Sequence, residues 1–285
     1  MKKLLSILLC LLLLAGCAEP YDGPTSAKRV CTRSEMEVFN PDGSHSHWYR
    51  EEYAYDLYGN RTQVLSYHND ELAEKSILRY DDQGNVLRQD SYAGGSWLPF
   101  PSYTYTYTYD DRGRQISSTN RHGWEKSTVT TVYDDEAMTR TVTGYGNVAV
   151  DYLNEQGWVL RTEQTFSDGR FILTEYERSA EGWLLGARSW ENGVLTSESV
   201  LTYDDQGRIL TQTEIEDGVS TLLFAWEYGE NRETMFYSDG ASNTVVYHDD
   251  GTMQCQYRTE ADGHLVSETF YYYTEIQVPA EEVSP

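Results

Sequence analysis

The sequence predicts an all-β protein in which tandem β-hairpins form one continuous antiparallel meander, an elongated or curled sheet. Turn signals such as Asn192-Gly193 recur roughly every ten to fifteen residues, and Asn-Gly or Asp-Gly supplies the positive φ angles of tight hairpin turns. The segments between them are rich in Thr, Val, Tyr, Ile and Leu and alternate with period two, as in residues 103–109. After the first 16 residues the sequence has no helical stripe. This turn spacing predicts about twenty strands.

A repeated unit begins with Tyr-Asp and carries glycine three residues after the aspartate. Looser copies begin at five further tyrosines, and consecutive unit tyrosines lie 19 to 29 residues apart, as surface loops of varying length would produce. The clear copies are Tyr55-Asp56 with Gly59, Tyr80-Asp81 with Gly84, Tyr109-Asp110 with Gly113, and Tyr203-Asp204 with Gly207; the looser ones begin at Tyr133, Tyr152, Tyr176, Tyr228 and Tyr247.

A structural role accounts for all three residue types of this unit. We expect the tyrosine to end a strand and to pack against its equivalent in the next unit. The aspartate then accepts hydrogen bonds from backbone amides of the turn, and the glycine adopts the left-handed conformation. Each unit stacks only on its neighbours, which is the organisation of a repeat protein.

The unit is followed by an aliphatic pair, Val86-Leu87 or Ile209-Leu210. With that pair it resembles the YD repeat of Rhs proteins, insecticidal toxin-complex shells and teneurins, over most of residues 50–270. The resemblance implies a spiralling β-sheet, which in large members closes around a toxin passenger. This chain is far shorter than those shells, and we find no self-cleavage segment and no C-terminal toxin domain. We therefore expect the fold without the encapsulation.

The N-terminus indicates export. Two lysines, an apolar run from Leu4 to Leu14 and small residues form a secretory signal over residues 1–16, and the run is too short to span a bilayer. Leu14-Ala15-Gly16-Cys17 resembles the lipobox of bacterial lipoproteins, which implies acylation of Cys17 and attachment to a membrane, facing outside the cytoplasm; the alternative is a conventional signal. Residues 17–28 are predicted to be a tether, 29–278 the repeat domain, and 279–285 a disordered tail.

Charge and cysteine content limit the partners. The net charge is −24, and it becomes −26 once Lys2 and Lys3 are removed with the signal, so a nucleic-acid partner is excluded by repulsion. Export permits a disulfide between Cys31 and Cys255. An extended sheet would place its two ends tens of ångströms apart, whereas a disulfide needs Cα atoms within about 7 Å. We therefore expect both thiols to stay free, and a bridge would require a closed or strongly curled array.

Catalytic and metal chemistry find little support. His45 and His47 alternate along a strand and so would face the same side, but no third ligand lies nearby, and a solvated strand edge is favoured over a metal site. Calcium binding is one interpretation of acidic turns such as Asp81-Asp82, but turn capping explains these residues with fewer assumptions. No nucleophile elbow, phosphate loop or thiol–histidine motif is present. We predict no enzyme activity, no cofactor and no metal.

Aromatic residues carry the remaining functional signal. The chain has 24 tyrosines and seven tryptophans. Trp158 and Trp183 directly follow Gly157 and Gly182, at the repeat position where the clear copies carry Asn or Arg. Stacked in register, the two rings would lie roughly 10 Å apart and could form a platform for a sugar or a partner protein. The competing interpretation, which we favour, is that each ring covers its own turn.

Three functions follow from these observations. The first is a non-enzymatic envelope lipoprotein whose repeat surface binds a glycan or a protein. The second is a shielding or immunity-like partner of a peptide or toxin, which requires a sheet closed enough to enclose a cavity. The third, which we rank lowest, is an envelope hydrolase. The ligand and the oligomeric state are not specified by the sequence.

Overall fold

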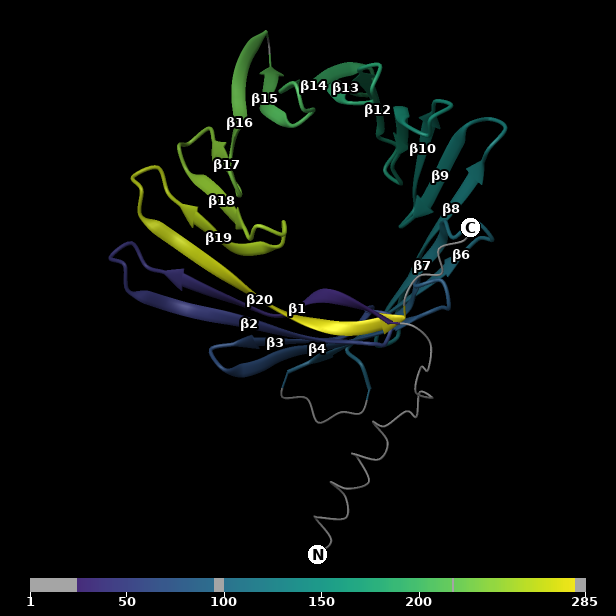
Figure 1. Ribbon diagram of the computed structural model, residues 1–285. Coiled ribbons are helices and arrows are strands. Elements are labelled where there is room, and N and C mark those ends of the chain that lie inside the picture. Colours follow the sequence, from purple (N-terminus) through teal and green to yellow (C-terminus); the bar gives the residue numbers. More distant parts are fainter. Residues whose placement is uncertain (1–24, 95–99, 217, 280–285) are drawn as a thin grey trace, which may run out of the picture.

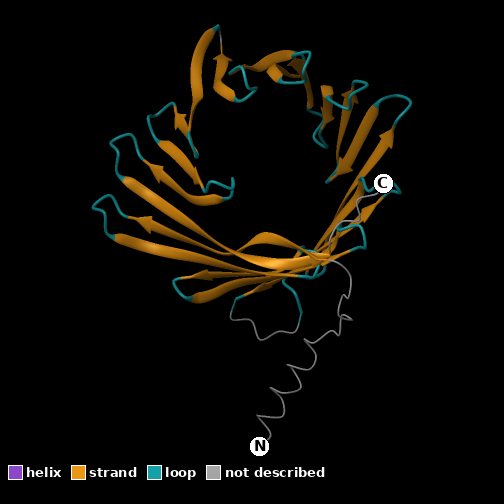
Figure 2. Cartoon of the chain, viewed as in Figure 1, coloured by secondary structure: helices purple, strands orange, loops and turns teal. Residues whose placement is uncertain are grey.

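The computed structural model is a ring of antiparallel strands (Figure 1). It describes residues 25–94, 100–216 and 218–279, which contain twenty strands and no helix (Figure 2). The strands are β1 (Thr25–Phe39), β2 (His45–Tyr55), β3 (Arg61–His68), β4 (Glu71–Tyr80), β5 (Val86–Ala93), β6 (Tyr103–Tyr109), β7 (Gln115–His122), β8 (Glu125–Asp134), β9 (Thr139–Gly144), β10 (Asn147–Leu153), β11 (Val159–Thr165), β12 (Phe171–Arg178), β13 (Leu184–Glu191), β14 (Val194–Tyr203), β15 (Ile209–Glu216), β16 (Val219–Gly229), β17 (Arg232–Tyr237), β18 (Ser242–Tyr247), β19 (Met253–Thr259) and β20 (Leu265–Pro279).

The sheet is closed. Each strand pairs with its neighbours in sequence, and β1 also pairs with β20, from Thr25 opposite Pro279 to Val38 opposite Ser267. The expected all-β antiparallel meander is confirmed, but the expected elongated or curled sheet is wrong, because the sheet is a barrel without free edges. The two closing strands have 15 residues each, and their pairing removes the exposed edges that an open twisted sheet would present.

The first and last strands, β1 and β20, show where the repeat domain begins and ends. Strand β1 begins at Thr25, inside the segment predicted to be a tether, and β20 ends at Pro279. The predicted signal, Cys17 and residues 280–285 lie outside the described residues. In the described part of the chain, no helix has the length and apolar character needed to cross a bilayer.

The two kinds of turn occupy opposite ends of the barrel. The Tyr-Asp turns connect even-numbered strands to the next odd-numbered strand, as between β2 and β3 or β4 and β5. They therefore lie side by side along one end, called the Tyr-Asp rim below. The turns that follow odd-numbered strands, such as Asn192-Gly193 between β13 and β14, lie along the opposite rim.

The two faces of the barrel wall can be assigned from the strand register, because residues directly opposite one another in neighbouring strands share a face. Ser34 lies opposite Glu51 of β2 and Tyr271 of β20, so these three side chains share one face. Side chains of this face from seven successive strands, β17 through β20 and then β1 to β3, converge on a single groove. A wall that brings seven strands together in this way is concave there, so this face is the inner one.

The barrel wall is a single layer without an apolar core. Among the described residues, the buried apolar side chains are Val30, Ala241 and Val278, and no large side chain is fully buried. Water therefore reaches both faces of the wall, and hydrogen bonds between strands and side-chain contacts within the layer have to hold the barrel together.

Candidate functional site

The clear Tyr-Asp turns share one hydrogen-bond pattern. The Asp56 amide donates to the Asn60 carbonyl (2.9 Å), and the Gly59 amide donates to the Asp56 carbonyl (3.1 Å). Asp56 Oδ1 also accepts the amides of Tyr58 and Asn60, both at 2.9 Å. Gly59 has a φ of 79°, the left-handed conformation in which glycine is favoured. Aspartate and glycine at these positions thus build the turn itself.

The tyrosine of the four clear copies, and that of the copy at Tyr228, joins its unit to the one before it. From the second copy on, its phenol donates to the backbone carbonyl two residues after the preceding turn glycine. Burial raises the pKa of these phenols, so they remain protonated donors. The bonds are Tyr55 to Cys31 (2.5 Å), which lies in β1 at the seam, Tyr80 to Arg61 (2.7 Å), Tyr109 to Val86 (2.9 Å), Tyr203 to Leu184 (2.7 Å) and Tyr228 to Ile209 (2.9 Å).

Two of the looser copies are shifted relative to the sequence interpretation. The turn bonds run from Asn154 to Trp158 and from Ser179 to Trp183, so the position before each turn belongs to Leu153 and Arg178 rather than to Tyr152 and Tyr176. Arg178 replaces the phenol with its guanidinium. Its Nε donates to the Val159 carbonyl and its Nη1 to the Gly182 carbonyl, both at 3.0 Å.

We predict that Arg178→Leu lowers the free energy of unfolding by about 1–3 kcal/mol, because two half-buried carbonyls lose their donor. Arg178→Tyr restores the residue that other units use and should recover most of that loss. Arg232→Leu is the control, because Arg232 is exposed and changes at such sites usually stay within about 0.5 kcal/mol. Urea unfolding measures all three variants. Equal losses in the Arg178→Leu and Arg232→Leu variants would contradict the structural role.

In several units the residue after the turn glycine covers the following unit. Trp158 packs on Gly182, where an added Cβ would lie 2.3 Å from the indole, and Trp183 packs on Gly207 and beside the Tyr203 ring at 5.4 Å. Arg114 occupies the same repeat position and lies 4.2 Å from the centre of the Tyr133 ring. The two tryptophans therefore cover the next turn and not their own. Both are half-buried, and this packing supports the structural interpretation of the rings.

The histidine pair is separated by a β-bulge. The pairing shifts between Val38 and Phe39, so His45 and His47 face opposite sides of the wall, and the expectation that they share a face is wrong. The nitrogen Nδ1 of His45 lies 3.5 Å from Glu37, whereas His47 contacts the rings of Tyr49 and His68. No group of three or more potential metal ligands occurs among the described residues.

In the acidic turns, the oxygens of the first aspartate accept hydrogen bonds from donors of the same turn. Asp81 Oδ1 accepts the amides of Gln83 and Asn85, and Oδ2 accepts the Asn85 side chain at 3.0 Å. That side-chain bond is the main reason why the pKa of Asp81 is lowered. The first carboxylate of the pair is thus committed to capping, as it is in Asp110 and Asp204.

The two cysteines are both free thiols. Cys31 lies opposite Tyr273 and Cys255 opposite Phe270 on β20, so the two residues flank β20 and their side chains point to opposite faces of the wall. Closure of the ring therefore places the two ends of the chain together without a disulfide.

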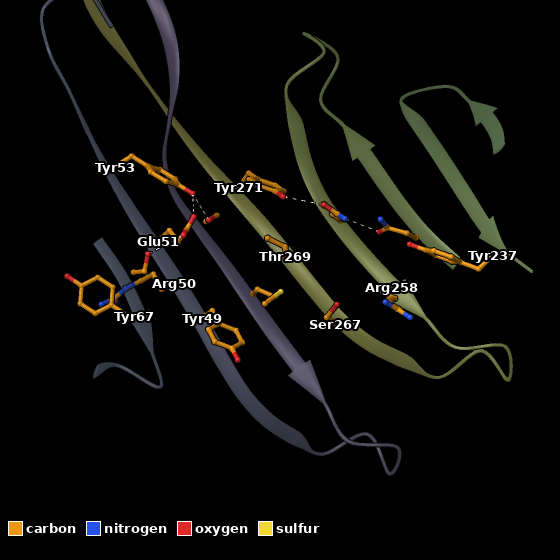
Figure 3. Close-up of a pocket in the computed structure, with 15 residues that line it drawn as sticks. Tyr49, Arg50, Glu51, Tyr53, Tyr67, Tyr237, Arg258, Ser267, Thr269 and Tyr271 are labelled. Carbon is orange, nitrogen blue, oxygen red and sulfur yellow. Dashed lines mark hydrogen bonds between the residues drawn. The ribbon is translucent and has the colours of Figure 1, made fainter. Parts of the chain in front are cut away.

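An open groove of ≈ 660 Å³ lies on the inner face at the seam where β1 meets β20 (Figure 3). Four tyrosines of the inner face line it, together with hydroxyl and amide side chains and one carboxylate, Glu51. The tyrosines are Tyr49, Tyr53, Tyr237 and Tyr271, and the neutral polar residues are Ser34, Ser66, Asn243, Gln256, Ser267 and Thr269.

Hydrogen bonds hold the polar side chains of the groove in place. The Tyr53 phenol donates to Glu51 Oε2 (2.6 Å) and lies 3.0 Å from the Ser34 hydroxyl, while Ser66 donates to Glu51 Oε1 (3.2 Å). Burial, and then the Glu51 bond, raises the pKa of the Tyr53 phenol well above its usual range, so that it remains a donor.

The other wall of the groove carries a second chain of hydrogen bonds. Tyr271 donates to Gln256 (3.4 Å), and Gln256 donates to Asn243 (3.0 Å). Among the described residues that line the groove, Glu51 is the only carboxylate, and Arg258 is the only cation that faces inward. Such a lining offers rings for stacking and fixed neutral donors and acceptors, with little net charge.

No protein-family model and no curated protein matches the chain. A TcdB2-TccC3-Cdc42 structure is similar at 14% identity over 84% of this chain and 14% of that chain, with a TM-score of 0.37. A porin-like protein from Bacteroides uniformis shares 13% identity over 89% of this chain and 99% of that chain (TM-score 0.42), and one from Bacteroides vulgatus 14% over 86% and 98% (TM-score 0.31). These similarities are too low to assign the chain to a family.

The sequence did not identify the groove. Tyr49 and Tyr53 alternate on β2 in a way that places them on one face, but Tyr237 and Tyr271 lie about two hundred residues away. Only closure of the ring brings the two sets together. The tryptophans that the sequence did single out lie at the Tyr-Asp rim and not in the groove.

Proposed function

We propose that the chain is a non-enzymatic envelope lipoprotein, anchored through Cys17 outside the cytoplasm, whose barrel binds a neutral glycan in the inner groove. The observation that supports this proposal is the lining of the groove. Tyrosine rings with fixed hydroxyl and amide groups match the alternating apolar faces and hydroxyl edges of a sugar chain. One inward carboxylate and one inward cation leave the groove close to neutral.

Charge at the Tyr-Asp rim supports a neutral ligand. The net charge is −24, and exposed carboxylates such as Asp82, Asp111 and Asp205 gather in the turns of this rim. A negative rim repels polyanions and leaves neutral chains unaffected. Glu51, the groove carboxylate, accepts two hydroxyl donors, which supports a role in holding the groove together rather than in acid–base catalysis.

The proposal predicts binding on an array of neutral glycans and cell-wall fragments. Tyr49→Ala and Tyr271→Ala should each weaken that binding about two- to ten-fold, because each removes a stacking surface. Tyr58→Ala is the matched control, because Tyr58 is 66% exposed and lies in the β2–β3 turn outside the groove. Trp158→Ala and Trp183→Ala test the tryptophan platform in the same experiment. Loss of binding in the tryptophan variants alone would move the site to the rim, and binding unaffected by all four substitutions would exclude both sites.

Closure of the sheet favours a second candidate function. A shielding partner of a peptide or toxin requires a sheet that encloses a space, and the pairing of β1 with β20 provides such a ring. The two candidate functions differ in what stays bound to the lipoprotein when it is purified from its own membrane. A bound polypeptide in native mass spectrometry supports shielding. A chain that carries no polypeptide and binds glycan supports the groove.

A further inference from the structure

The outer face of β6–β10 differs in composition from the rest of this acidic chain. Hydroxyl side chains form two rows across the strands. Among the described residues of these strands, the one carboxylate that projects outward by register is Asp134, which ends β8 at the Tyr-Asp rim and accepts the turn amides of Glu136 and Ala137. One row runs from Thr106 through Thr119 to Thr128, and the other from Thr108 through Ser117 and Thr130 to Thr143. Val132 and Val148 add exposed aliphatic surface. We call this surface the outer patch.

Two cations lie at one end of the outer patch without a partner. Arg121 and Lys126 are directly opposite one another on β7 and β8, both are exposed, and neither makes an ion pair or hydrogen bond with another described residue. Like charges directly opposite one another destabilise a sheet. In a chain of net charge −24, two unpaired cations at this spacing indicate an anionic partner.

Aromatic side chains project from the neighbouring hairpin connections at the same end. Trp124 between β7 and β8 is fully exposed (104%), and Tyr145 between β9 and β10 is 67% exposed. Phe100, just before β6, is 74% exposed. None of these three rings contacts another aromatic ring among the described residues. The described residues of three connections at this rim therefore each include an exposed ring.

We propose that the outer patch docks on the surface of an anionic lipid bilayer. Trp and Tyr settle at the headgroup level of membranes, and Lys or Arg beside them attract anionic lipids. The outer patch combines both features with a wall of hydroxyl and aliphatic groups, and its one outward carboxylate, Asp134, lies at the opposite rim from the two cations and caps its own turn. At physiological salt the Debye length is about 8 Å, so the distant acidic turns are screened while the two cations act at contact. This docking would lay the barrel on its side and is independent of the groove.

The test uses residues 18–285, which contain every described strand but no acylation site, and vesicles of equal parts phosphatidylglycerol and phosphatidylcholine. We expect co-sedimentation with these vesicles, weaker binding at high salt, and little binding to phosphatidylcholine alone. Arg121→Glu should weaken binding about ten-fold or more, because each cation near an anionic surface contributes about five-fold. Trp124→Ala should weaken it several-fold.

Matched controls separate docking from general effects of charge or aromatic content. Arg232→Glu makes the same charge change at an exposed arginine of β17, and Tyr58→Ala removes an exposed ring from the Tyr-Asp rim. Neither should alter vesicle binding. Absence of binding, equal binding to neutral vesicles, or equal losses in control and patch variants would overturn the proposal. An acidic protein or polysaccharide would then be the alternative partner of the outer patch.

Discussion

Ser34→Pro should open the barrel and lower the free energy of unfolding by about 3 kcal/mol or more. Ser34 lies in β1 between Glu51 of β2 and Tyr271 of β20, and it is 8% exposed. A proline there lacks the amide donor and does not fit the middle of a sheet. Thermal unfolding checks the prediction, and for a chain of this size the melting temperature should fall by roughly 6–12 °C.

Two further variants distinguish a closed ring from an open array. In an open repeat sheet β1 would be a terminal strand, so Ser34→Pro would unravel one strand and cost far less than a proline in the middle of the array. In the ring, Thr174→Pro on β12 should cost about as much as Ser34→Pro. Asp82→Pro controls for proline itself, because Pro41 already occupies the corresponding position of the Asn40–Ser44 turn, which has the same hydrogen-bond pattern. A clearly smaller loss at Ser34 than at Thr174 would contradict closure.

Turn chemistry and strand alternation are local properties, and the sequence therefore predicted the strands and their order. Closure depends on how twist and curvature add up over twenty strands, which no single segment encodes. The length of the first and last strands was the available signal, because each forms an uninterrupted run of 15 residues. Closure of the ring brings residues near 34–53 beside residues near 237–271. The groove forms only through this closure, so no local sequence pattern predicts it.

The shifted copies show a limit of matching residues by identity. Residue identity matches Tyr152 and Tyr176 to the tyrosine of the unit, but the turn is defined by the residue whose side chain caps it. Asn154 and the Ser179 hydroxyl accept turn amides as aspartate does elsewhere. The glycines three residues later, Gly157 and Gly182, carry the correct register. Counting back from glycine rather than forward from tyrosine would have placed Arg178 in the repeat.

Asp90→Asn should lower the free energy of unfolding by about 1–3 kcal/mol. Asp90 is 2% exposed on β5, and its carboxylate accepts two bonds from Arg88 Nε (2.8 and 3.0 Å), one from Arg88 Nη2 (2.8 Å) and one from the Thr104 hydroxyl (2.9 Å). An amide in this place cannot accept the same set, so donors on two neighbouring strands lose their partner. Because 42% of the Arg88 side chain is exposed, water compensates part of that loss, which keeps the expected cost below that of a fully buried pair.

The cost of Asp90→Asn should depend on pH. Burial opposes ionisation of Asp90, but the bonds from Arg88 and Thr104 outweigh it and lower the pKa of the carboxyl. An unfolded aspartate titrates near pH 3.9. As pH falls, the unfolded chain therefore binds its proton first, and the stabilisation from Asp90 is full above about pH 4 and lost through the lower native pKa. The free energies of unfolding of wild type and variant, measured with urea, should converge once the pH falls below the native pKa of Asp90.

Asp168→Asn provides the matched control for this convergence. Asp168 also pairs with an arginine two residues away, Arg170, at 2.8 Å, but 55% of its side chain is exposed. Exposed pairs contribute little, because water and salt screen them, so the control should cost much less at neutral pH. Equal losses for the two variants at every pH would mean that the buried Arg88–Asp90–Thr104 contact does not stabilise the wall. A larger, acid-sensitive loss at Asp90 would show that polar contacts within the layer replace the missing apolar core.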